Sequence, residues 1–443
     1  MLNYYLRMAW KSLRRTPGLS LLMISGIGLG ISACIVTLTV FHAMSGNPIW
    51  WKNRVLYAVT LDSRSAHAKS PKDDGPRDEL DYRDATYLFT SHVPKHRTLM
   101  TLLMGAIAGA PGQVRPLPVF TRATTSGFFQ MFDVPFQYGG PWHAAADQGP
   151  EPVIVLSAHE NEKLFGGRDS VGKTLLWNRH RFRIVGVLAH WDPQPRFYDL
   201  TGAGSGDFGK PENAFIPFQW APTLHIWPAG DLECRHSAPG ATYASLLSSN
   251  CGWIEMWAEL PNAAARRRYL ALMNAYTAQQ QTTGRFKGLL DNRLWTVSQW
   301  LRAHHVVSER SRMLVALAFA LLTVCLINTV GLLLAKFLRG APLLGVRRAL
   351  GARRSQIFAQ HLIEAAVLCT LGSALGLALG VAGLKGVRLL YAHSSAAYGK
   401  LAHFDPLGML WALGLCIVAT LVAGFYPALR AGRVTPAAYL KSQ

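Results

Sequence analysis

Charged side chains are scarce in this sequence, acidic ones most of all. Only 16% of its 443 residues are charged, against about 25% in an average soluble domain. Its 25 acidic residues are outnumbered by 45 basic ones, giving a formal net charge of +20. Cysteine is also rare. With six cysteines in the whole chain, a small disulfide-rich scaffold is excluded. Half of the residues are apolar, which excludes general disorder.

Long apolar segments explain the low charge. A helix needs about 20 apolar residues to cross a bilayer, and four segments are long enough. They are residues 19–41, 313–335, 362–384 and 407–429. The sequence therefore predicts a membrane protein with four transmembrane α-helices and a large α/β periplasmic domain inserted between helices 1 and 2. A cleaved signal peptide stays open as an alternative for the first segment, which is longer than a usual signal core but ends near a passable cleavage triplet at 43–45.

Charge asymmetry predicts the orientation of these segments. The flanks 1–17, 336–356 and 430–443 contain basic residues and no acid. The positive-inside rule places such flanks in the cytoplasm, so we expect the large domain outside. The predicted organisation, in chain order, is a cytoplasmic amphipathic segment (1–18), helix 1 (19–42), a periplasmic core domain with stalk helices (43–312), helix 2 (313–335), a cytoplasmic coupling segment (336–356), helix 3 (357–384), a periplasmic loop (385–406), helix 4 (407–429) and a cytoplasmic tail (430–443). These positions explain the basic excess without nucleic acid.

Small residues within the apolar segments predict close helix packing. They follow the GxxxG spacing that lets helices approach within lipid, at Gly26, Gly30, Gly372, Gly376 and Gly380. Packing inside one subunit and packing against a second subunit both stay open.

Glu364 is the one charge inside the four segments. An intramembrane acid is a candidate for function by default. Its position near the start of its segment favours an interfacial structural role, near water or basic neighbours such as Arg348, over a proton relay.

Hydrophobic alternation and capping residues outline the large domain. We expect strands at 55–61, 152–156, 181–188 and 253–260, and helices at 157–165 and 262–281 that begin at Ser157 and Asn262. Residues 77–104 are expected to be largely helical, and 192–209 to form a loop. A helix at 297–312 is expected to run directly into the second span and to act as a rigid stalk.

Two cysteines, Cys234 and Cys251, lie in the large domain, whereas the other four lie within predicted spans. An oxidising compartment would allow this pair to form a disulfide. Two buried thiols are the alternative, because the sequence does not give the distance between the two Cα atoms.

Residues 167–174 (GRDSVGKT) match the phosphate-loop pattern GxxxxGK[ST]. That loop needs a strand before it and a helix after it, whereas here a helix is expected before and a β-hairpin after. We therefore predict a turn. No HExxH or GxSxG pattern occurs either, so we predict no enzymatic activity and no catalytic, cofactor or metal site in this chain.

Several motifs in order resemble those of MacB/FtsX-type permeases, the mechanotransmission class of ATP-binding-cassette transporters. They are 9–17 (AWKSLRRTP), 127–134 (GFFQMFDV), 155–157 (VLS), 163–167 (KLFGG), 171–174 (VGKT), 184–187 (IVGV), 345–352 (GVRRALGA) and 424–428 (GFYPA) with Pro436. The resemblance covers almost the whole chain and includes a MacB-like periplasmic core domain, without a fused ATPase.

The resemblance implies a dimeric permease subunit of the bacterial inner membrane, with both termini cytoplasmic. It would couple ATP hydrolysis by a separate ATPase, which binds ATP and Mg, to periplasmic motion that exports a small molecule or peptide. Lipoprotein extraction and signalling to a periplasmic partner stay open as alternatives. The implied partners are that ATPase, a second permease (identical or different) and membrane lipid, with a periplasmic adaptor and an outer-membrane channel as further candidates.

By the same resemblance, four residues couple the chain to the ATPase: Gly345, Arg347, Arg348 and Gly351. The Arg-Glu pair that often precedes this segment in the family is replaced by Pro342 and Leu343. Coupling then relies on the arginines and on shape, or this subunit is the weaker half of an unequal pair.

Overall fold

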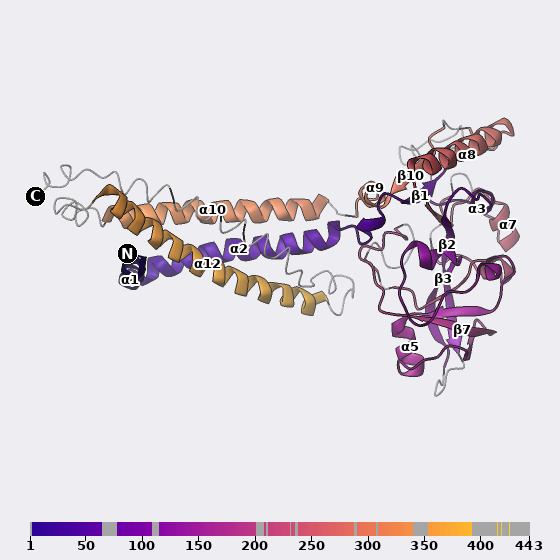
Figure 1. Cartoon of the computed structure of the whole chain (residues 1–443), viewed down its shortest axis with the longest axis horizontal. Coiled ribbons are helices and arrows are strands. Elements are labelled where there is room, and N and C mark those ends of the chain that lie inside the picture. The colour runs from indigo at the N-terminus through magenta and orange to yellow at the C-terminus, as the bar shows by residue number, and fades with distance from the viewer. Residues whose placement is uncertain are drawn as a thin grey trace, which may run out of the picture. The chain divides into compact units, whose positions relative to one another are not determined.

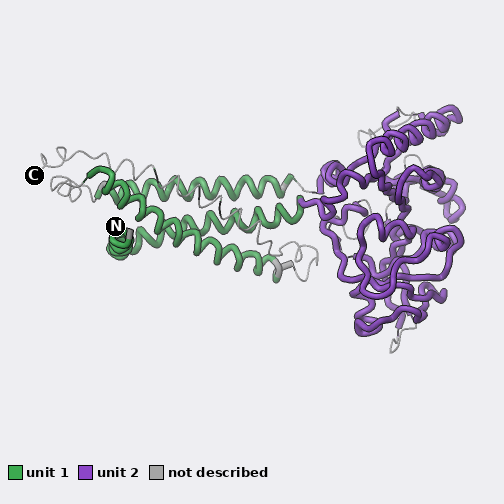
Figure 2. Tube along the Cα trace, viewed as in Figure 1, with its two compact units in different colours: residues 1–45, 307–443 green, residues 46–306 purple. Residues whose placement is uncertain are grey.

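The computed structural model describes two compact units (Figure 2). The helical unit comprises residues 1–45 and 307–443, and the α/β unit is the single stretch Gly46–Val306. The residues described are 2–63, 78–108, 115–200, 208–209, 211–230, 232–234, 238–287, 290–306, 309–339, 353–391, 414, 418 and 425.

Long helices make up most of the described part of the helical unit (Figure 1). They are α1 (Leu2–Arg15), α2 (Pro17–Ser45), α10 (Glu309–Arg339) and α12 (Arg354–Tyr391). Three stretches are long and apolar enough to cross a membrane: Pro17–Ser45, Ser311–Phe337 and Arg354–Val387, with hydropathies of 2.2, 2.4 and 2.0. The fourth predicted span, 407–429, lies outside the described residues except for three helical positions, Gly414, Val418 and Phe425.

Helix α2 is the centre of the helical unit, because it packs against both α10 and α12. Pro17 opens it, at a position where the missing N–H of proline removes no helical hydrogen bond. A stripe of α2 that includes Ile27, Ile31 and Ile35 is fully buried against Leu322 of α10 and Leu384 of α12. Apolar contact on two sides therefore fixes the rotation of α2 about its own axis.

The α/β unit is built on a ten-stranded sheet with the strand order β10-β1-β9-β2-β3-β8-β5-β7-β4, with β6 pairing β2 and β7. The strands are β1 (Leu56–Thr60), β2 (His96–Ala108), β3 (Leu117–Thr124), β4 (Phe136–Gly139), β5 (Val153–Leu156), β6 (Thr174–Trp177), β7 (His180–Leu188), β8 (Ala214–Pro217), β9 (Glu255–Glu259) and β10 (Arg293–Thr296). Most neighbours are antiparallel, but β3 pairs with β8 and β5 pairs with β7 in parallel.

Short helices connect and cover these strands. They are η1 (Trp50–Lys52), α3 (Tyr82–Phe89), α4 (Gly127–Met131), η3 (Ala144–Asp147), α5 (Ala158–Phe165), α6 (Trp220–Thr223), α7 (Tyr243–Ser248), α8 (Ala263–Thr282) and α9 (Val297–Ala303). The predicted caps are confirmed, because the side chain of Ser157 accepts a hydrogen bond from the N–H of Glu160 and that of Asn262 from the N–H of Ala265. The expected strands near 55–61, 152–156, 181–188 and 253–260 correspond to β1, β5, β7 and β9.

One side of the sheet carries the main core, and Trp177 shows how tightly it is packed. This side chain is fully buried, and its indole N–H donates to the hydroxyl of Thr121 at 2.9 Å. Gly105 lies against the ring, so a Cβ added there would lie 2.6 Å from Nε1. A larger residue at position 105 would therefore displace the indole.

Two predictions about helices are wrong. Residues 77–104 contain only the short helix α3, and the apolar residues after it form the long strand β2. Residues 98–103 are all buried, because β2 is covered on both faces, so the alternation typical of a strand is missing.

The predicted continuous stalk at 297–312 is also broken. Helix α9 ends at Ala303, and His305 takes a left-handed conformation with a φ of 50°. The N–H of Val306 then bonds back to the carbonyl of Leu301, as in a Schellman cap. Helix α10 is a separate helix that starts at Glu309. The single helix expected over 297–312 is therefore interrupted after α9.

Candidate functional site

The predicted ATPase-coupling residues cannot be placed geometrically. Gly345, Arg347, Arg348 and Gly351, together with Pro342 and Leu343, lie outside the described residues. The structure does describe the two helices that flank this segment, of which α10 ends at Arg339 and α12 begins at Arg354. The coupling role of these residues stays a prediction.

A buried charged cluster lies where α1, α10 and α12 meet. Glu364 of α12 is only 3% exposed. Its Oε1 accepts a hydrogen bond from the hydroxyl of Ser12 at 2.6 Å and lies 2.6 Å from Nζ of Lys336. Nδ1 of His361, one turn earlier on α12, lies 3.7 Å from Oε2, and the His361 ring contacts Phe337 with 4.0 Å between ring centroids. The carboxylate thus joins three helices.

This geometry corrects the expected surroundings of Glu364. Because α12 already begins at Arg354, Glu364 lies well inside the helix rather than close to its start. Its basic partner is Lys336, near the end of α10. The acid could be recognised in the sequence but its partner could not, because Lys336 looks like any basic residue that follows an apolar segment.

A glycine seam joins α12 to α2. A Cβ added to Gly372 would lie 2.6 Å from Ile27, one at Gly376 would lie 2.8 Å from Ile31, and one at Gly380 would lie 3.1 Å from Ile35. Each of the three glycines thus contacts one isoleucine. The glycines are four positions apart on α12, and the isoleucines are four positions apart on α2. The described packing is within one subunit.

The two glycines predicted to pack from α2, Gly26 and Gly30, differ in their contacts. Gly30 faces α10, because its Cβ would lie 3.0 Å from Leu322. Gly26 has no heavy atom of the described residues within 4 Å of its Cβ position, so it makes no such contact there, and packing of Gly26 against a second subunit stays a prediction. Gly28 makes the contact instead, with a Cβ position 3.1 Å from Leu375, because the buried stripe of α2 passes through 27, 28 and 31.

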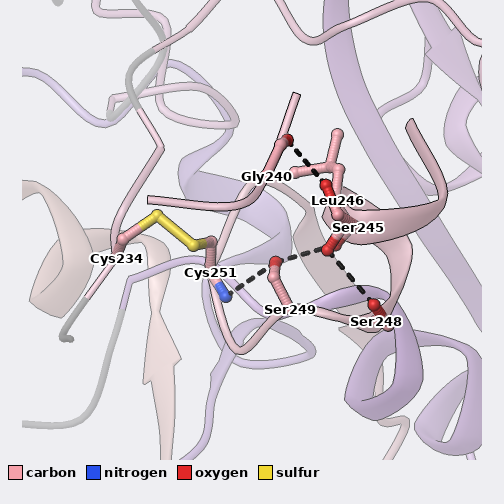
Figure 3. Close-up of a disulfide and its surroundings, with 7 residues drawn as sticks. All are labelled: Cys234, Gly240, Ser245, Leu246, Ser248, Ser249 and Cys251. Atoms are coloured by element: carbon pink, nitrogen blue, oxygen red, sulfur yellow. Dashed lines mark hydrogen bonds between the residues drawn. A yellow bond between two sulfur atoms is a disulfide. The ribbon is translucent and has the colours of Figure 1, made fainter. Parts of the chain in front are cut away.

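A disulfide joins Cys234 and Cys251 in the α/β unit (Figure 3). The two Cα atoms are 4.3 Å apart. Beside the bond, Glu233 and Gly252 form an antiparallel bridge with hydrogen bonds of 3.0 and 3.1 Å in both directions. The crosslink therefore closes a loop whose ends are already paired.

The phosphate-loop look-alike is a turn between α5 and the β6–β7 hairpin, as its context predicts. Its backbone N–H groups are used internally. That of Gly172 donates to Ile184 O, that of Lys173 to Ser170 O and that of Val171 to the carboxylate of Asp169. A phosphate loop must leave such groups free to point at the ligand, and in this turn these three N–H groups are already engaged.

A second buried charged cluster, which no sequence pattern predicted, lies in the α/β unit. Arg122 of β3 is fully buried, and its guanidinium donates to Glu212 (2.9 Å from Nε), to Glu255 (3.2 Å) and to Asp199. Arg196 also donates to Glu212, at 2.5 Å. Both Arg196 and Asp199 come from the segment predicted as an ordinary loop, and residues 195–199 of that segment are in fact buried.

The pKa values within this cluster diverge. Burial raises the pKa of Glu255 well above its usual value, and the charge of Asp199 raises it further. Burial also acts on Asp199 and Glu212, but the guanidinium groups of Arg122 and Arg196 outweigh it and hold both pKa values below their usual range. Glu255 therefore keeps its proton to a higher pH than the other two, which leaves two carboxylates opposite two guanidinium groups.

An aromatic layer covers this cluster. Phe128 of α4 packs edge-on against Tyr198 with 5.6 Å between ring centroids, and Phe132 packs against Trp257 at 5.7 Å. Gly127 allows the approach of α4, because a Cβ there would lie 2.4 Å from the carbonyl oxygen of Arg97. The segment 127–134 is thus structural.

Comparison with known proteins gives two family matches. Residues 20–245 match the model of the MacB-like periplasmic core domain, and residues 315–436 match that of the FtsX-like permease C-terminal region. The chain is 24% identical over 441 residues to a pyoverdine export ATP-binding/permease protein PvdT of Pseudomonas syringae pv. tomato, covering 99% of this chain and 58% of that protein. It is 23% identical to a macrolide export ATP-binding/permease protein MacB of Wolinella succinogenes, covering 99% of this chain and 60% of that protein.

The chain thus spans about three fifths of the length of these relatives. Among solved structures, the periplasmic region of MacB from Actinobacillus actinomycetemcomitans matches with 12% identity and a TM-score of 0.35, covering 58% of this chain and 94% of that one. The extracellular domain of the transporter YknZ matches with 11% identity and a TM-score of 0.34, covering 54% and 98%.

Proposed function

This chain belongs to the family of permeases with a MacB-like periplasmic core domain and an FtsX-like C-terminal region, and we propose that it acts as the permease subunit of an ATP-binding-cassette transporter. In this role, ATP hydrolysis by a separate ATPase drives movement of the helical unit, which the α/β unit turns into export. ATP and Mg bind the ATPase, and this chain carries out no catalytic step.

One observation carries the proposal. The α/β unit is one uninterrupted stretch of chain, Gly46–Val306, that begins after α2 and ends before α10. Any change in the relation of α2 to α10 therefore reaches both ends of that stretch. Because α2 packs tightly against α10 and α12, such a change is a rearrangement of packed helices, which has discrete alternatives.

We propose four spans, with both termini in the cytoplasm and the α/β unit in the periplasm of a bacterial inner membrane. The basic flanks support this orientation. The disulfide between Cys234 and Cys251 supports an oxidising compartment for the α/β unit. Single cysteines placed on the surface of this unit should react with an impermeant maleimide in spheroplasts, whereas cysteines at 340–352 should not.

The coupling segment is proposed to dock on the ATPase through Arg347 and Arg348. Guanidinium groups suit the carboxylates of a partner protein, and Gly345 and Gly351 permit close approach or a tight bend. With Pro342 and Leu343 in place of the family's common Arg-Glu pair, the arginines and the shape of the segment supply the contact.

Export of a small molecule or peptide is the proposed outcome. Its support is that the similar proteins named above export pyoverdine or macrolides. A second permease completes the dimer, and a periplasmic adaptor with an outer-membrane channel would carry cargo onward.

Affinity purification of the tagged chain from its native membranes tests the proposal. An ATP-binding-cassette ATPase should copurify, and the complex should hydrolyse ATP. Lys173→Ala serves as the control for the phosphate-loop look-alike and should leave hydrolysis unchanged. Recovery of the chain without any such ATPase, or ATP binding by the isolated chain that Lys173→Ala removes, would overturn the proposal.

A further inference from the structure

The Lys336–Glu364 pair is buried within helices that have the length and composition of membrane spans. The side chains are 8% and 4% exposed, and their charged atoms lie 2.6 Å apart. The same carboxylate oxygen accepts the hydrogen bond from Ser12 of α1. One oxygen atom thus holds three helices that are distant in the sequence.

Stability alone is a weak reason for such a pair. Desolvating two charges offsets much of their attraction, and apolar residues of similar volume often stabilise a protein as well or better. What an apolar pair lacks is a fixed position, because side chains such as Leu and Met can slide past each other by a fraction of a turn. A buried ion pair specifies which atoms meet, and so fixes the register of the two helices.

The surroundings support a role in register. An apolar layer lies next to the pair and includes Leu13 of α1, Leu333 of α10 and Leu368 of α12. Such a layer holds the helices together without choosing a register. Lys336 lies in the last turn of α10, just before residue 340, and α12 begins at Arg354. The pair therefore links α10, the helix before the coupling segment, to α12, the helix after it.

We propose that Glu364 is a positioning residue that locks α1, α10 and α12 in one register, so that displacement of the coupling segment moves the three helices together. This inference rests on the proposed function. Without the lock, α10 and α12, which each pack against α2, would shift on α2 independently of each other.

Two variants and a control separate this role from simple stabilisation. Glu364→Gln removes the charge and leaves Lys336 buried without its partner. The double variant Lys336→Met/Glu364→Leu replaces the pair with apolar side chains and is expected to keep the fold. Glu309→Gln, at the exposed opposite end of α10, is the matched control.

The first measurement is amide hydrogen exchange of the full chain in lipid nanodiscs without an ATPase. Exchange at 333–339 and 354–363 should rise about tenfold or more in both pair variants, with no change in α2 or in Glu309→Gln. Exchange at the wild-type rate in the double variant would overturn the inference, because the pair would then be only one way of filling space.

The second measurement is ATP hydrolysis and transport by the copurified complex. The double variant should hydrolyse ATP but lose at least nine tenths of transport per ATP, with thermal unfolding of the chain unchanged. Wild-type transport per ATP would contradict the lock. Failure of the proposed function would appear differently, as a wild-type chain that binds no ATPase, and the exchange measurement would still test the lock.

Discussion

The two units bury charge in different ways. The helical unit places one carboxylate, Glu364, opposite one ammonium group where three helices meet. The α/β unit buries a larger set, in which Arg122 on β3 binds the carboxylates of Asp199 and Glu212 and the carboxyl group of Glu255 on β9. The first arrangement ties α10 to α12, two helices that each pack against α2. The second fastens a long irregular segment onto a sheet, a task that apolar contacts alone would leave unspecific.

Removal of Arg122 is the most severe test of this comparison. In Arg122→Met, Asp199 and Glu212 lose a guanidinium partner while they stay buried, which should destabilise the α/β unit by roughly 3–5 kcal/mol. Denaturant unfolding of the full chain, followed by tryptophan fluorescence, measures the loss. Arg181→Met, on the exposed side of β7, is the control and should change stability little. Equal stability of the two variants would show that the network is not needed to hold the loop.

The disulfide should matter for the α/β unit alone. Replacing Cys234 and Cys251 with Ser should destabilise this unit by about 3 kcal/mol, the loss expected for a loop of this length. Unfolding of the helical unit, followed by far-ultraviolet circular dichroism in detergent, should be unaffected. Equal losses in both units would mean that they unfold as one, and the comparison between them would fail.

The glycine seam gives the corresponding test in the helical unit. Gly376→Ala places a methyl group 2.8 Å from Ile31 and 2.9 Å from a backbone oxygen of Gly28, which should destabilise the bundle by about 1–3 kcal/mol. Gly26→Ala is the matched control, since a Cβ at this position meets no atom of the described residues within 4 Å. Thermal unfolding in nanodiscs should separate the two variants. If they lose the same stability, the α2–α12 contact is not the seam described above.

Glu255 should produce a smaller effect, a change of stability with pH whose direction can be predicted. Its pKa is raised in the folded state, so the folded protein binds a proton that the unfolded chain has already released. As the pH rises from the usual glutamate value toward the raised pKa, stability should fall, by at most about 1.4 kcal/mol per pH unit. Glu255→Gln should flatten this decline, as measured by urea unfolding at several pH values. A wild-type stability that rises over the same range would contradict the assignment.

Local features of the fold were predictable from the sequence, whereas tertiary ones were not. Ser157 and Asn262 cap helices through bonds to residues three positions on, so short windows of sequence contain both partners. β2 was not recognised because burial on both faces removes alternation. The break after α9 depends on the left-handed conformation of His305, which is uncommon for residues other than glycine and leaves no pattern in the sequence.

The candidate sites show the same contrast between local features, which could be predicted, and tertiary contacts, which could not. Glu364 stands out in the sequence because its neighbours are apolar, but its partners Lys336 and Ser12 come from other helices. Glycine spacing predicted the seam on α12 but did not point to Gly28 on α2, since spacing gives a face of a helix and not its neighbour. Arg122 and Arg196 carried no signal, because a buried arginine is defined by contacts distant in the sequence.

The most direct test of the central claim, that this chain couples a separate ATPase to movement of its α/β unit, is transport by the copurified complex with Arg347→Glu/Arg348→Glu. The account predicts that transport and permease-dependent stimulation of ATP hydrolysis are both lost, while the chain stays inserted and the disulfide between Cys234 and Cys251 still forms. Full stimulation and transport in this variant would contradict the claim and leave the two arginines with a role in membrane orientation alone.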